Sequence, residues 1–340
     1  MGVIGVGRIG VFHAETLAGL RDVAQVTVAD VNRGRAREVA SRLGVAVLET
    51  PEALFASGID AVVVAAPTPA HAPLLEFAAA AGLPVFCEKP VALELDVLDD
   101  VSAVVERASI LVQVGFQRRF DAGYRAAQAA VTAGSLGELL VLRAATHDPV
   151  PPAEDYIAHS GGIFRDLHIH DFDAIRYVTG EEIVEVYADG AVRETPWFAD
   201  HGDVDSAVAV LRLSGGALGV VTGTRRDPLG YDVRLELFGV TDSIAVGVDH
   251  RSPIRSVEPG AAPPADGYRN FVERFGAAYR QELDDFVTAV ASGAPSPCTL
   301  ADAREALCVA LAAERSRAER RPVAIEEVAG ATSVAERESC

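Results

Sequence analysis

The chain has 340 residues, 49% of them apolar, and this length and composition favour about two packed domains over a disordered chain. Its 49 acidic and 30 basic residues give a net charge of −19, which disfavours binding to nucleic acid or anionic membranes. No apolar run approaches the ~18–20 residues that cross a bilayer, and no basic leader is visible, so we expect neither a membrane segment nor a signal peptide.

Residues 2–115 alternate short apolar runs with segments that have helical character. The predicted strands are Val3–Val6, Val23–Asp30, Val45–Leu48, Ala61–Ala65, Val85–Glu88 and Ile110–Val114. The predicted helices between them are Gly10–Leu20, Arg33–Leu43, Pro51–Ser57, Pro69–Ala81 and Leu95–Ala108. Strands that are apolar on both faces and separated by helices are typical of a parallel sheet covered on both sides. We therefore predict an α/β fold with an N-terminal, doubly wound parallel sheet.

The pattern changes after about residue 116. Helices are predicted over Asp121–Ala133 and Gly162–Val178, with the strand Glu138–His147 and a loop at Pro149–Pro152 between them. Alternating runs follow at Val184–Ala188, Ser206–Leu213, Ala217–Thr224, Tyr231–Phe238 and Ser243–Val248, and Leu213–Ala217 is typical of a tight hairpin. A loop at Pro253–Gly267, helices over Phe271–Ala291 and Leu300–Glu319, and a short strand at Val323–Glu327 complete the chain. We predict a C-terminal α+β domain with an open, mainly antiparallel sheet.

The segment Gly5-Val6-Gly7-Arg8-Ile9-Gly10 is a GxGxxG sequence that follows a strand and opens a helix, and Asp30 ends the next strand. This context predicts a dinucleotide site, in which Gly5 allows the turn, Gly7 lets the backbone approach the pyrophosphate and Gly10 packs the helix on the strand. Asp30 would bind the adenosine ribose and repel a 2′-phosphate, which favours NAD, whereas Arg33 could pair with such a phosphate. A glycine-rich turn without a cofactor is the alternative.

The segment from Ala65 to His71 follows the fourth strand, at the carboxyl edge where such sheets bind ligands. Thr68 is interpreted as a helix N-cap or a cofactor contact, and His71 as a surface histidine or a cofactor contact. The candidate cofactor-binding residues are Gly5, Gly7, Arg8, Ile9, Gly10, Asp30, Val31, Arg33, Ala66, Thr68, His71, Glu88 and Lys89.

Lys89 is the only lysine among thirty basic residues. It lies in Cys87-Glu88-Lys89-Pro90, directly after the fifth strand and therefore at the same edge of the sheet. An ammonium group can be tuned toward neutrality and donates as a compact point charge, whereas a guanidinium cannot. Pro90 fixes the backbone of the turn. We predict that Lys89 is catalytic; a coding bias toward arginine explains the rest of the surface.

A second candidate cluster lies in the predicted helix that contains Gly-Gly-Ile-Phe-Arg-Asp-Leu-His-Ile-His-Asp-Phe-Asp, residues 161–173. At ~100° per residue, Asp166, His170 and Asp173 share one face of an α-helix. Asp166 and His170 are four residues apart, so the carboxylate can orient the imidazole and raise its basicity. A histidine with a near-neutral pKa suits removal of a proton from an alcohol. The alternative is a solvated Asp–His pair on an exposed helix.

His168 and Asp171 fall on the apolar side of the same helix. His168 is interpreted as a packed, hydrogen-bonded histidine, and the pattern suggests no role for Asp171. A His-x-His metal site would lack spaced Cys or Glu partners, so no metal is predicted. Four cysteines, Cys87, Cys298, Cys308 and Cys340, have neither CxxC spacing nor the density of a disulfide framework, which favours a cytoplasmic protein.

Together these motifs resemble the glucose–fructose oxidoreductase/inositol dehydrogenase (Gfo/Idh/MocA) oxidoreductases. The resemblance runs from Gly5–Gly10 through Glu88-Lys89-Pro90 to Asp166 and His170, and includes the last two helices. Three segments, residues 115–121, 161–173 and 274–282, resemble the inositol 2-dehydrogenase branch. The resemblance implies an NAD-binding Rossmann domain over residues 1–118 and a substrate-binding and oligomerisation domain over residues 119–328, whose C-terminal helix packs back on the first domain. Residues 329–340 would form a tail.

The resemblance also implies an active site between the two domains, with Lys89, Asp166 and His170 matching the catalytic trio. The implied substrate-binding residues are Lys89, Gln117, Arg118, Asp148, Asp166, His170, Tyr231 and Tyr279. The sequence departs from its relatives at Gln117, where they carry Asn or Met, and at Asp148, where some inositol enzymes carry Asn.

The resemblance implies NAD-dependent oxidation of a secondary hydroxyl of a cyclic polyol, with myo-inositol converted to 2-keto-myo-inositol. Other expected substrates are scyllo-inositol, D-chiro-inositol, glucose or an amino-sugar intermediate. A non-catalytic NAD(H)-binding sensor is the alternative from another class, and the presence of Lys89, Asp166 and His170 together disfavours it. We expect a homo-oligomer, a tetramer or a dimer, with no nucleic-acid or membrane partner.

Overall fold

The structure is a computed structural model that describes residues 1–330. The chain forms two compact units, one of residues 1–117 with 277–304, the other of residues 118–276 with the described residues from 305 onward. Most of the tail expected at residues 329–340 lies outside the described residues. Within residues 1–330, no helix has both the length and the apolar character that a membrane span requires.

The first unit is built on a six-stranded parallel sheet with the order β3-β2-β1-β4-β5-β6. Its strands are β1 (Gly2–Ile4), β2 (Thr27–Ala29), β3 (Ala46–Val47), β4 (Val62–Val64), β5 (Val85–Glu88) and β6 (Val112–Gly115). Its helices are α1 (Arg8–Gly19), α2 (Arg33–Leu43), α3 (Pro51–Phe55), η1 (Thr68–Ala70), α4 (His71–Ala81), α5 (Leu95–Ala108) and most of α10 (Phe271–Ser292). The predicted doubly wound sheet is confirmed.

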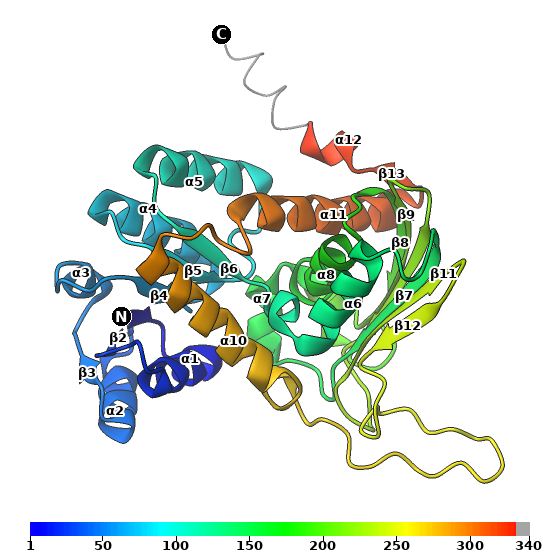
Figure 1. Ribbon diagram of the computed structural model, residues 1–340, viewed down its shortest axis with the longest axis horizontal. Helices are drawn as coiled ribbons and strands as arrows, with labels where there is room; N and C mark the ends of the chain where they lie inside the picture. The colour runs from blue at the N-terminus through cyan, green and yellow to red at the C-terminus, as the bar shows by residue number, and fades with distance from the viewer. Residues whose placement is uncertain (331–340) are drawn as a thin grey trace. The chain divides into compact units, whose positions relative to one another are not determined.

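Helices cover both faces of this sheet, which is why its strands are apolar throughout. Val3, Val28, Val63 and Phe86 pack with α1, α2 and residues 283–287 of α10 in one continuous core. Figure 1 shows α1 and α10 on one side of the sheet and α4 and α5 on the other. All residues of β1, β4 and β5 are buried as a result.

The second unit is built on a seven-stranded sheet with the order β12-β11-β7-β10-β9-β8-β13. Its strands are β7 (Leu139–His147), β8 (Ile183–Ala191), β9 (Ser206–Leu213), β10 (Leu218–Thr224), β11 (Asp232–Gly239), β12 (Ser243–Val246) and β13 (Val323–Ala324). Its helices are α6 (Ala122–Thr132), α7 (Glu154–Ser160), η3 (Phe164–His168), α8 (Ile169–Thr179), α9 (Trp197–Asp200) and α12 (Glu326–Ala329), and it shares η2 (Gln117–Phe120) and α11 (Leu300–Glu319) with the first unit.

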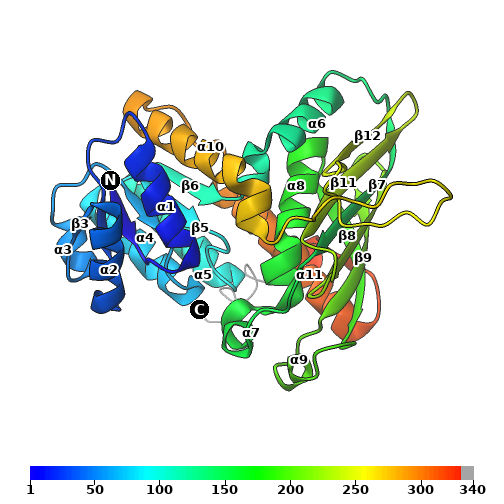
Figure 2. The ribbon, with the colours of Figure 1, turned by 90° about the horizontal axis from the view of Figure 1, so that it is seen from below.

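Five of the strand pairs in this sheet are antiparallel, and β7 and β10 are parallel. The prediction of a mainly antiparallel sheet is confirmed, as is the hairpin at Leu213–Ala217, where β9 turns into β10. Figures 1 and 2 show α6 and α8 on one face of the sheet, while no helix of residues 1–330 covers its other face.

Some local predictions are wrong. The strand expected at Val323–Glu327 has only two residues, because the carboxylate of Glu327 accepts a hydrogen bond from the backbone of Ala324 and pairs with Arg321, and a helical turn follows. The sequence pattern did not predict α7 and α9, since helices this short contain too few residues to display a helical repeat.

Candidate active site

The glycine turn between β1 and α1 is shaped by two close contacts. Gly5 has a φ of +88°, and a Cβ at this position would lie 2.6 Å from the carbonyl oxygen of Ala65. A Cβ on Gly10 would lie 1.9 Å from the carbonyl oxygen of Gly5. Gly7, the N-cap of α1, would bring a Cβ within 4 Å of no described atom, so backbone there is accessible to a ligand. Open backbone at the N-terminus of a helix fits the pyrophosphate of a dinucleotide.

Asp30 follows β2 and is buried beside this turn. Its Oδ2 accepts a hydrogen bond from the backbone of Val6 at 2.8 Å, and its Oδ1 accepts one from Asn32 at 2.7 Å. Because each carboxylate oxygen has a second lone pair, Asp30 can also accept the two hydroxyls of a ribose. Arg33, the residue that could pair with a 2′-phosphate, lies 3.5 Å from Glu49. The residues present therefore fit NAD.

His71 ties two strand ends together at the same edge. Its Nδ1 lies 2.8 Å from the carbonyl oxygen of Pro90, after β5, and its Nε2 lies 2.7 Å from that of Ala66, after β4. The side chain is buried, so its interpretation as a surface histidine is wrong. The reason is that the ring fills the space between the two turns, one of which carries Lys89. His71 thus supports the turn on which Lys89 lies.

The turn after β4 also contains Thr68. Thr68 begins η1, and neither η1 nor α4 has a side-chain cap hydrogen bond, since Pro67 and Ala70 occupy the N-cap positions. The N-cap interpretation of Thr68 is therefore wrong. Its interpretation as a cofactor contact stays a prediction.

Two predicted substrate residues lie in the first unit. Tyr279, in α10, is buried and packs edge-on against Phe12 and His13, with ring centroids 5.8 and 6.1 Å apart. Gln117 is the last residue of the unit's first segment and is also buried, and its Oε1 has no hydrogen-bond partner among the described residues. That amide oxygen has unused hydrogen-bonding capacity.

In the second unit, residues 162–179 form one helical stretch that contains the π-helical segment η3. A π-helical turn holds more residues than an α-helical turn, so the spacing assumed for this face does not apply. Asp173, expected to share a face with Asp166 and His170, is instead buried and pairs with Arg119 at 2.6 Å. His170 is half-buried at the start of α8.

Asp166 is held by two residues that the sequence analysis missed. The hydroxyl of Tyr156 donates to its Oδ1 at 2.7 Å, and Arg225 donates to its Oδ2 at 2.8 Å. Arg225 also donates to Asp148 at 3.1 Å. Since Asp166 is only 7% exposed, the alternative of a solvated pair on an exposed helix is wrong.

The neighbouring carboxylates determine the protonation states of Tyr156 and Arg225. The Asp166 carboxylate, together with burial, raises the pKa of Tyr156, so the phenol stays protonated and remains a donor. Burial alone would lower the pKa of Arg225, but Asp166 and Asp148 outweigh it and hold that pKa above its ordinary value. Arg225 therefore stays charged between two carboxylates.

Sheet register explains why Asp148, Arg225 and Tyr231 lie at the same end of the second sheet. In the parallel pair of β7 and β10, His147 lies opposite Thr224, so the next residues, Asp148 and Arg225, are neighbours. In the antiparallel pair of β11 and β7, Asp232 lies opposite His147, which brings the preceding residue, Tyr231, to the same end. The sequence signal for Arg225 was a charged residue directly after a predicted strand. Its partner Asp148 lies 77 positions away, so the sequence pattern did not pair the two.

Arg118 is buried in the second unit and completes a separate network. It donates to Asp171 at 2.5 Å and to Thr146 at 2.9 Å, and Asp171 also contacts Nδ1 of His168 at 2.9 Å. Burial would raise the pKa of Asp171, but Arg118 and His168 hold it well below its ordinary value. This supplies the role that the sequence pattern did not suggest for Asp171, and it confirms that His168 is packed and hydrogen-bonded.

Comparisons with known proteins cover nearly the whole chain. Residues 1–116 match an oxidoreductase family with an NAD-binding Rossmann fold, and residues 124–245 match the GFO/IDH/MocA C-terminal domain. Myo-inositol 2-dehydrogenase of Thermotoga maritima is 41% identical over 333 residues, which are 97% of this chain and 99% of that protein.

Solved structures agree with this. A probable dehydrogenase from Thermotoga maritima has a TM-score of 0.91 at 40% identity, covering 96% of this chain and 99% of that one. Scyllo-inositol dehydrogenase from Lactobacillus casei, with bound NAD(H) and scyllo-inositol, has a TM-score of 0.85 at 28% identity, covering 95% and 98%.

Proposed function

Since the chain belongs to the GFO/IDH/MocA family of NAD-binding oxidoreductases, we propose that it oxidises a secondary hydroxyl of a cyclic polyol, and that it converts myo-inositol to 2-keto-myo-inositol. Similarity to a myo-inositol 2-dehydrogenase over almost the full length of both chains supports this substrate. One observation carries the assignment to a dehydrogenase. The chain's only lysine directly follows β5, at the sheet edge that also carries the glycine turn after β1.

The proposed catalytic residues are Lys89, Asp166 and His170. His170 accepts the hydroxyl proton at a ring nitrogen as the alcohol becomes a ketone. Lys89 donates a hydrogen bond to the oxygen as alkoxide charge develops on it. Asp166, fixed by Tyr156 and Arg225, orients His170. NAD⁺, when bound, supplies the acceptor for the hydride that leaves the same carbon.

The proposed substrate-binding residues have the donors and acceptors that a polyol needs. Asp148 and Tyr231 come together at neighbouring strand ends and offer a carboxylate and a phenol. Gln117 and Arg118 each have a buried polar atom, Oε1 and Nε, without a hydrogen-bond partner among the described residues. Tyr279 is assigned on the resemblance to the family.

A panel of polyols tests the proposed function. Initial rates of NADH formation would be compared for myo-inositol, scyllo-inositol, D-chiro-inositol, glucose and an amino sugar, with NAD⁺ and with NADP⁺. We expect the highest kcat/KM with myo-inositol and NAD⁺. Scyllo-inositol is the second candidate, because a structurally similar enzyme binds it. Binding of NADH without turnover of any polyol would instead support a sensor.

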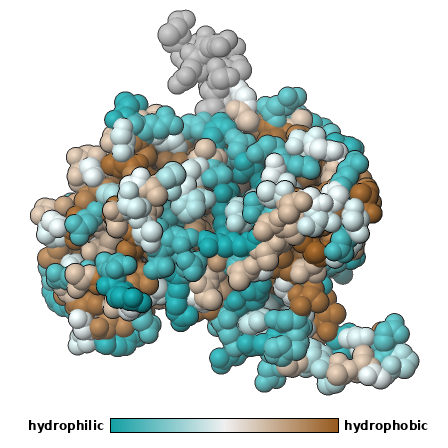
Figure 3. All heavy atoms as spheres, in the orientation of Figure 1, coloured by the Kyte–Doolittle hydropathy of each residue, from teal (hydrophilic) through white to brown (hydrophobic). Residues whose placement is uncertain are grey.

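We also propose that the open face of the second sheet joins copies of the chain into a homo-oligomer, a tetramer or a dimer. Tyr187, Val208, Val210 and Leu218 on this face are 40–47% exposed. Tyr187 lies opposite Val210 across β8 and β9, so the apolar residues form a continuous patch. Hydrophobic residues also gather at the outer side of this sheet in Figure 3.

Replacing Val210 with Glu tests the interface. A carboxylate in the middle of the patch would be desolvated on assembly, so we expect Val210→Glu to shift the protein to a smaller species in size-exclusion chromatography with light scattering. Val257→Glu, at an 89% exposed loop position, is the control and should leave the assembly unchanged. A monomeric wild type would contradict the proposal.

A cytoplasmic location is part of the proposed function. It is supported by cysteines that have no disulfide-type spacing in the sequence.

A further inference from the structure

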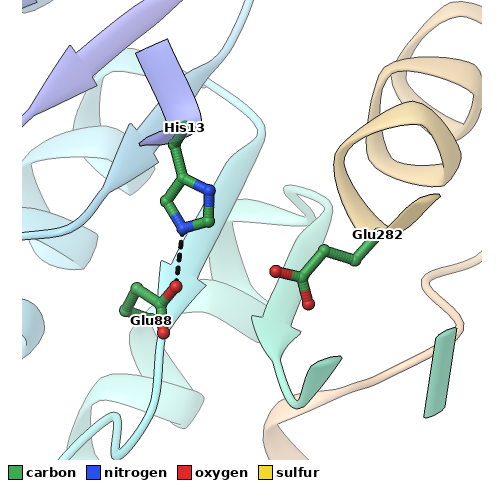
Figure 4. A group of neighbouring side chains, drawn as sticks. All are labelled: His13, Glu88 and Glu282. Carbon is green, nitrogen blue, oxygen red and sulfur yellow. Dashed lines mark hydrogen bonds and ion pairs between the residues drawn. The ribbon is translucent and has the colours of Figure 1, made fainter. Parts of the chain in front are cut away.

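Three buried titratable side chains meet in the first unit, next to the turn that carries Lys89. His13 comes from α1, Glu88 from the end of β5 and Glu282 from α10, and Figure 4 shows that the carboxyl group of Glu282 points toward the other two. His13 and Glu282 are fully buried, and Glu88 is 8% exposed. One nitrogen or oxygen atom from each lies within 4.8 Å of the others. Two carboxyl groups and an imidazole therefore share one small space.

The carboxyl groups of Glu88 and Glu282 differ in their hydrogen bonds. Nε2 of His13 lies 2.6 Å from Oε1 of Glu88, and Oε2 of Glu88 accepts the backbone N–H of Lys89 at 3.3 Å. Gln113 donates to the backbone oxygen of Glu282 at 2.7 Å, which fixes that turn of α10. Neither carboxyl oxygen of Glu282 has a hydrogen-bond partner among the described residues. An ionised carboxylate is far more costly in such a position than a protonated one.

The surroundings also disfavour a second negative charge. Rings of Phe86 and Tyr279 pack edge-on against His13, with centroids 5.4 and 6.1 Å away. A Cβ on Gly115 would lie 3.2 Å from Oε2 of Glu88, so the strand beside it leaves little space. Burial, with the Glu88 carboxylate nearby, raises the pKa of Glu282 well above its ordinary value.

The titratable groups around Glu282 come from three elements. His13 on α1 and Glu88 on β5 lie against Glu282, Tyr279 on α10 packs against His13, and β6 contributes the neutral Gln113. His71 interacts electrostatically with Glu88 and with Lys89.

A divalent metal could use the same ligand types, but one distance argues against it. At metal–ligand distances of about 2.0–2.1 Å, two ligands of one metal lie roughly 2.9 Å or more apart. The His13 nitrogen and the Glu88 oxygen are 2.6 Å apart, which is within hydrogen-bond distance and closer than two ligands of one metal ion. The distance therefore fits a hydrogen bond between His13 and Glu88 better than two ligands of one metal ion.

We propose that Glu282 is a protonated carboxylic acid that shares its proton with Glu88, and that this His13–Glu88–Glu282 cluster positions Lys89. Two carboxyl groups in one buried space cannot both ionise, so one proton stays on the pair. Since no direct hydrogen bond joins the two carboxyl groups, one water molecule between them would carry the shared proton. Glu88 holds the peptide N–H of Lys89, so a displacement of Glu88 moves the backbone of Lys89. Glu282 is thus a positioning residue, and this part of the inference rests on the proposed function of Lys89.

The pH dependence of unfolding tests whether Glu282 is protonated in the folded protein. A glutamate whose pKa is raised in the folded state stabilises the fold below its unfolded pKa, and that stability is lost as pH rises toward the folded pKa. Relative to Glu282→Gln, which mimics the protonated acid, the wild-type folded-to-unfolded ratio should fall about tenfold per pH unit above ~pH 4.3. Urea unfolding between about pH 5 and 8 measures this. Parallel pH profiles for the two proteins would overturn the proposal.

A matched variant controls for simple charge removal. Asp284→Asn neutralises an exposed acid two positions along the same helix. Its unfolding should follow the wild-type pH profile, because this side chain is exposed to water in the folded protein as it is in the unfolded chain. If Asp284→Asn reproduced the profile of Glu282→Gln, the effect would be one of net charge and the proposal would fail. A stoichiometric bound metal in the purified wild type would also overturn it.

The positioning role is tested by kcat. Glu282→Leu introduces an apolar side chain of similar size that cannot hold the proton, and we expect it to lower kcat about tenfold with little change in NADH affinity. Glu282→Gln should restore most of that loss. Equal kcat for Glu282→Leu and wild type would overturn the positioning role. If the wild type oxidised no polyol, the proposed function would fail, while the unfolding experiment would still decide whether Glu282 holds a proton.

Discussion

Lys89→Met is expected to remove most polyol oxidation while leaving NADH affinity close to that of the wild type. Methionine keeps much of the length and apolar stem of lysine but cannot donate a hydrogen bond to an oxygen that gains alkoxide character. The loss of a donor and of a charge at the reacting oxygen should lower kcat by on the order of 10²–10⁴-fold. Steady-state rates with saturating polyol measure kcat, and quenching of NADH fluorescence measures cofactor binding.

Lys89→Arg is the matched control for charge. A guanidinium keeps the positive charge, but it is larger, planar and not tunable toward neutrality, so this variant should also stay at least about tenfold below wild type. A Lys89→Met enzyme with wild-type kcat would exclude Lys89 from catalysis. Loss of NADH binding in the same variant would indicate a structural or cofactor-binding role instead.

Asp171→Asn is expected to destabilise the second unit more than any surface substitution. The change leaves the guanidinium of Arg118 fully buried without its carboxylate partner and also weakens the contact with His168. Breaking a buried ion pair in this way costs about 3–5 kcal/mol. The free energy of unfolding from urea titration at neutral pH measures the loss.

The pH dependence of this loss has a definite sign. Because the pKa of Asp171 is held below its ordinary value in the folded protein, its contribution is present above the unfolded pKa of about 3.9 and is lost as pH falls toward the folded pKa. The difference in the free energy of unfolding between wild type and Asp171→Asn should therefore become smaller as the pH falls. Glu319→Gln, in an exposed pair with Arg315, is the control and should change stability little. A loss below about 1 kcal/mol for Asp171→Asn would contradict a stabilising role for this network.

Much of this protein was predictable from patterns that act between neighbours along the chain. The alternation of apolar strands and helices before residue 116 predicted the parallel sheet, and the spacing of Gly5, Gly7, Gly10 and Asp30 predicted a turn whose close contacts the structure contains. These signals are local, because helical and strand periodicity and the sterics of a turn depend on residues close in sequence.

Tertiary structure alone decided which charged groups meet. Arg225 lies beside Asp148 only because β7 and β10 pair in parallel at one register, and Glu282 faces Glu88 only because α10 packs into the core of the first sheet. Asp171 lies on an apolar face of its helix because its partner Arg118, 53 positions earlier in the sequence, is buried beside it. Sequence periodicity contains no information on such pairs, since the free energy that selects them comes from desolvating and pairing charges that the folded chain brings together from distant positions.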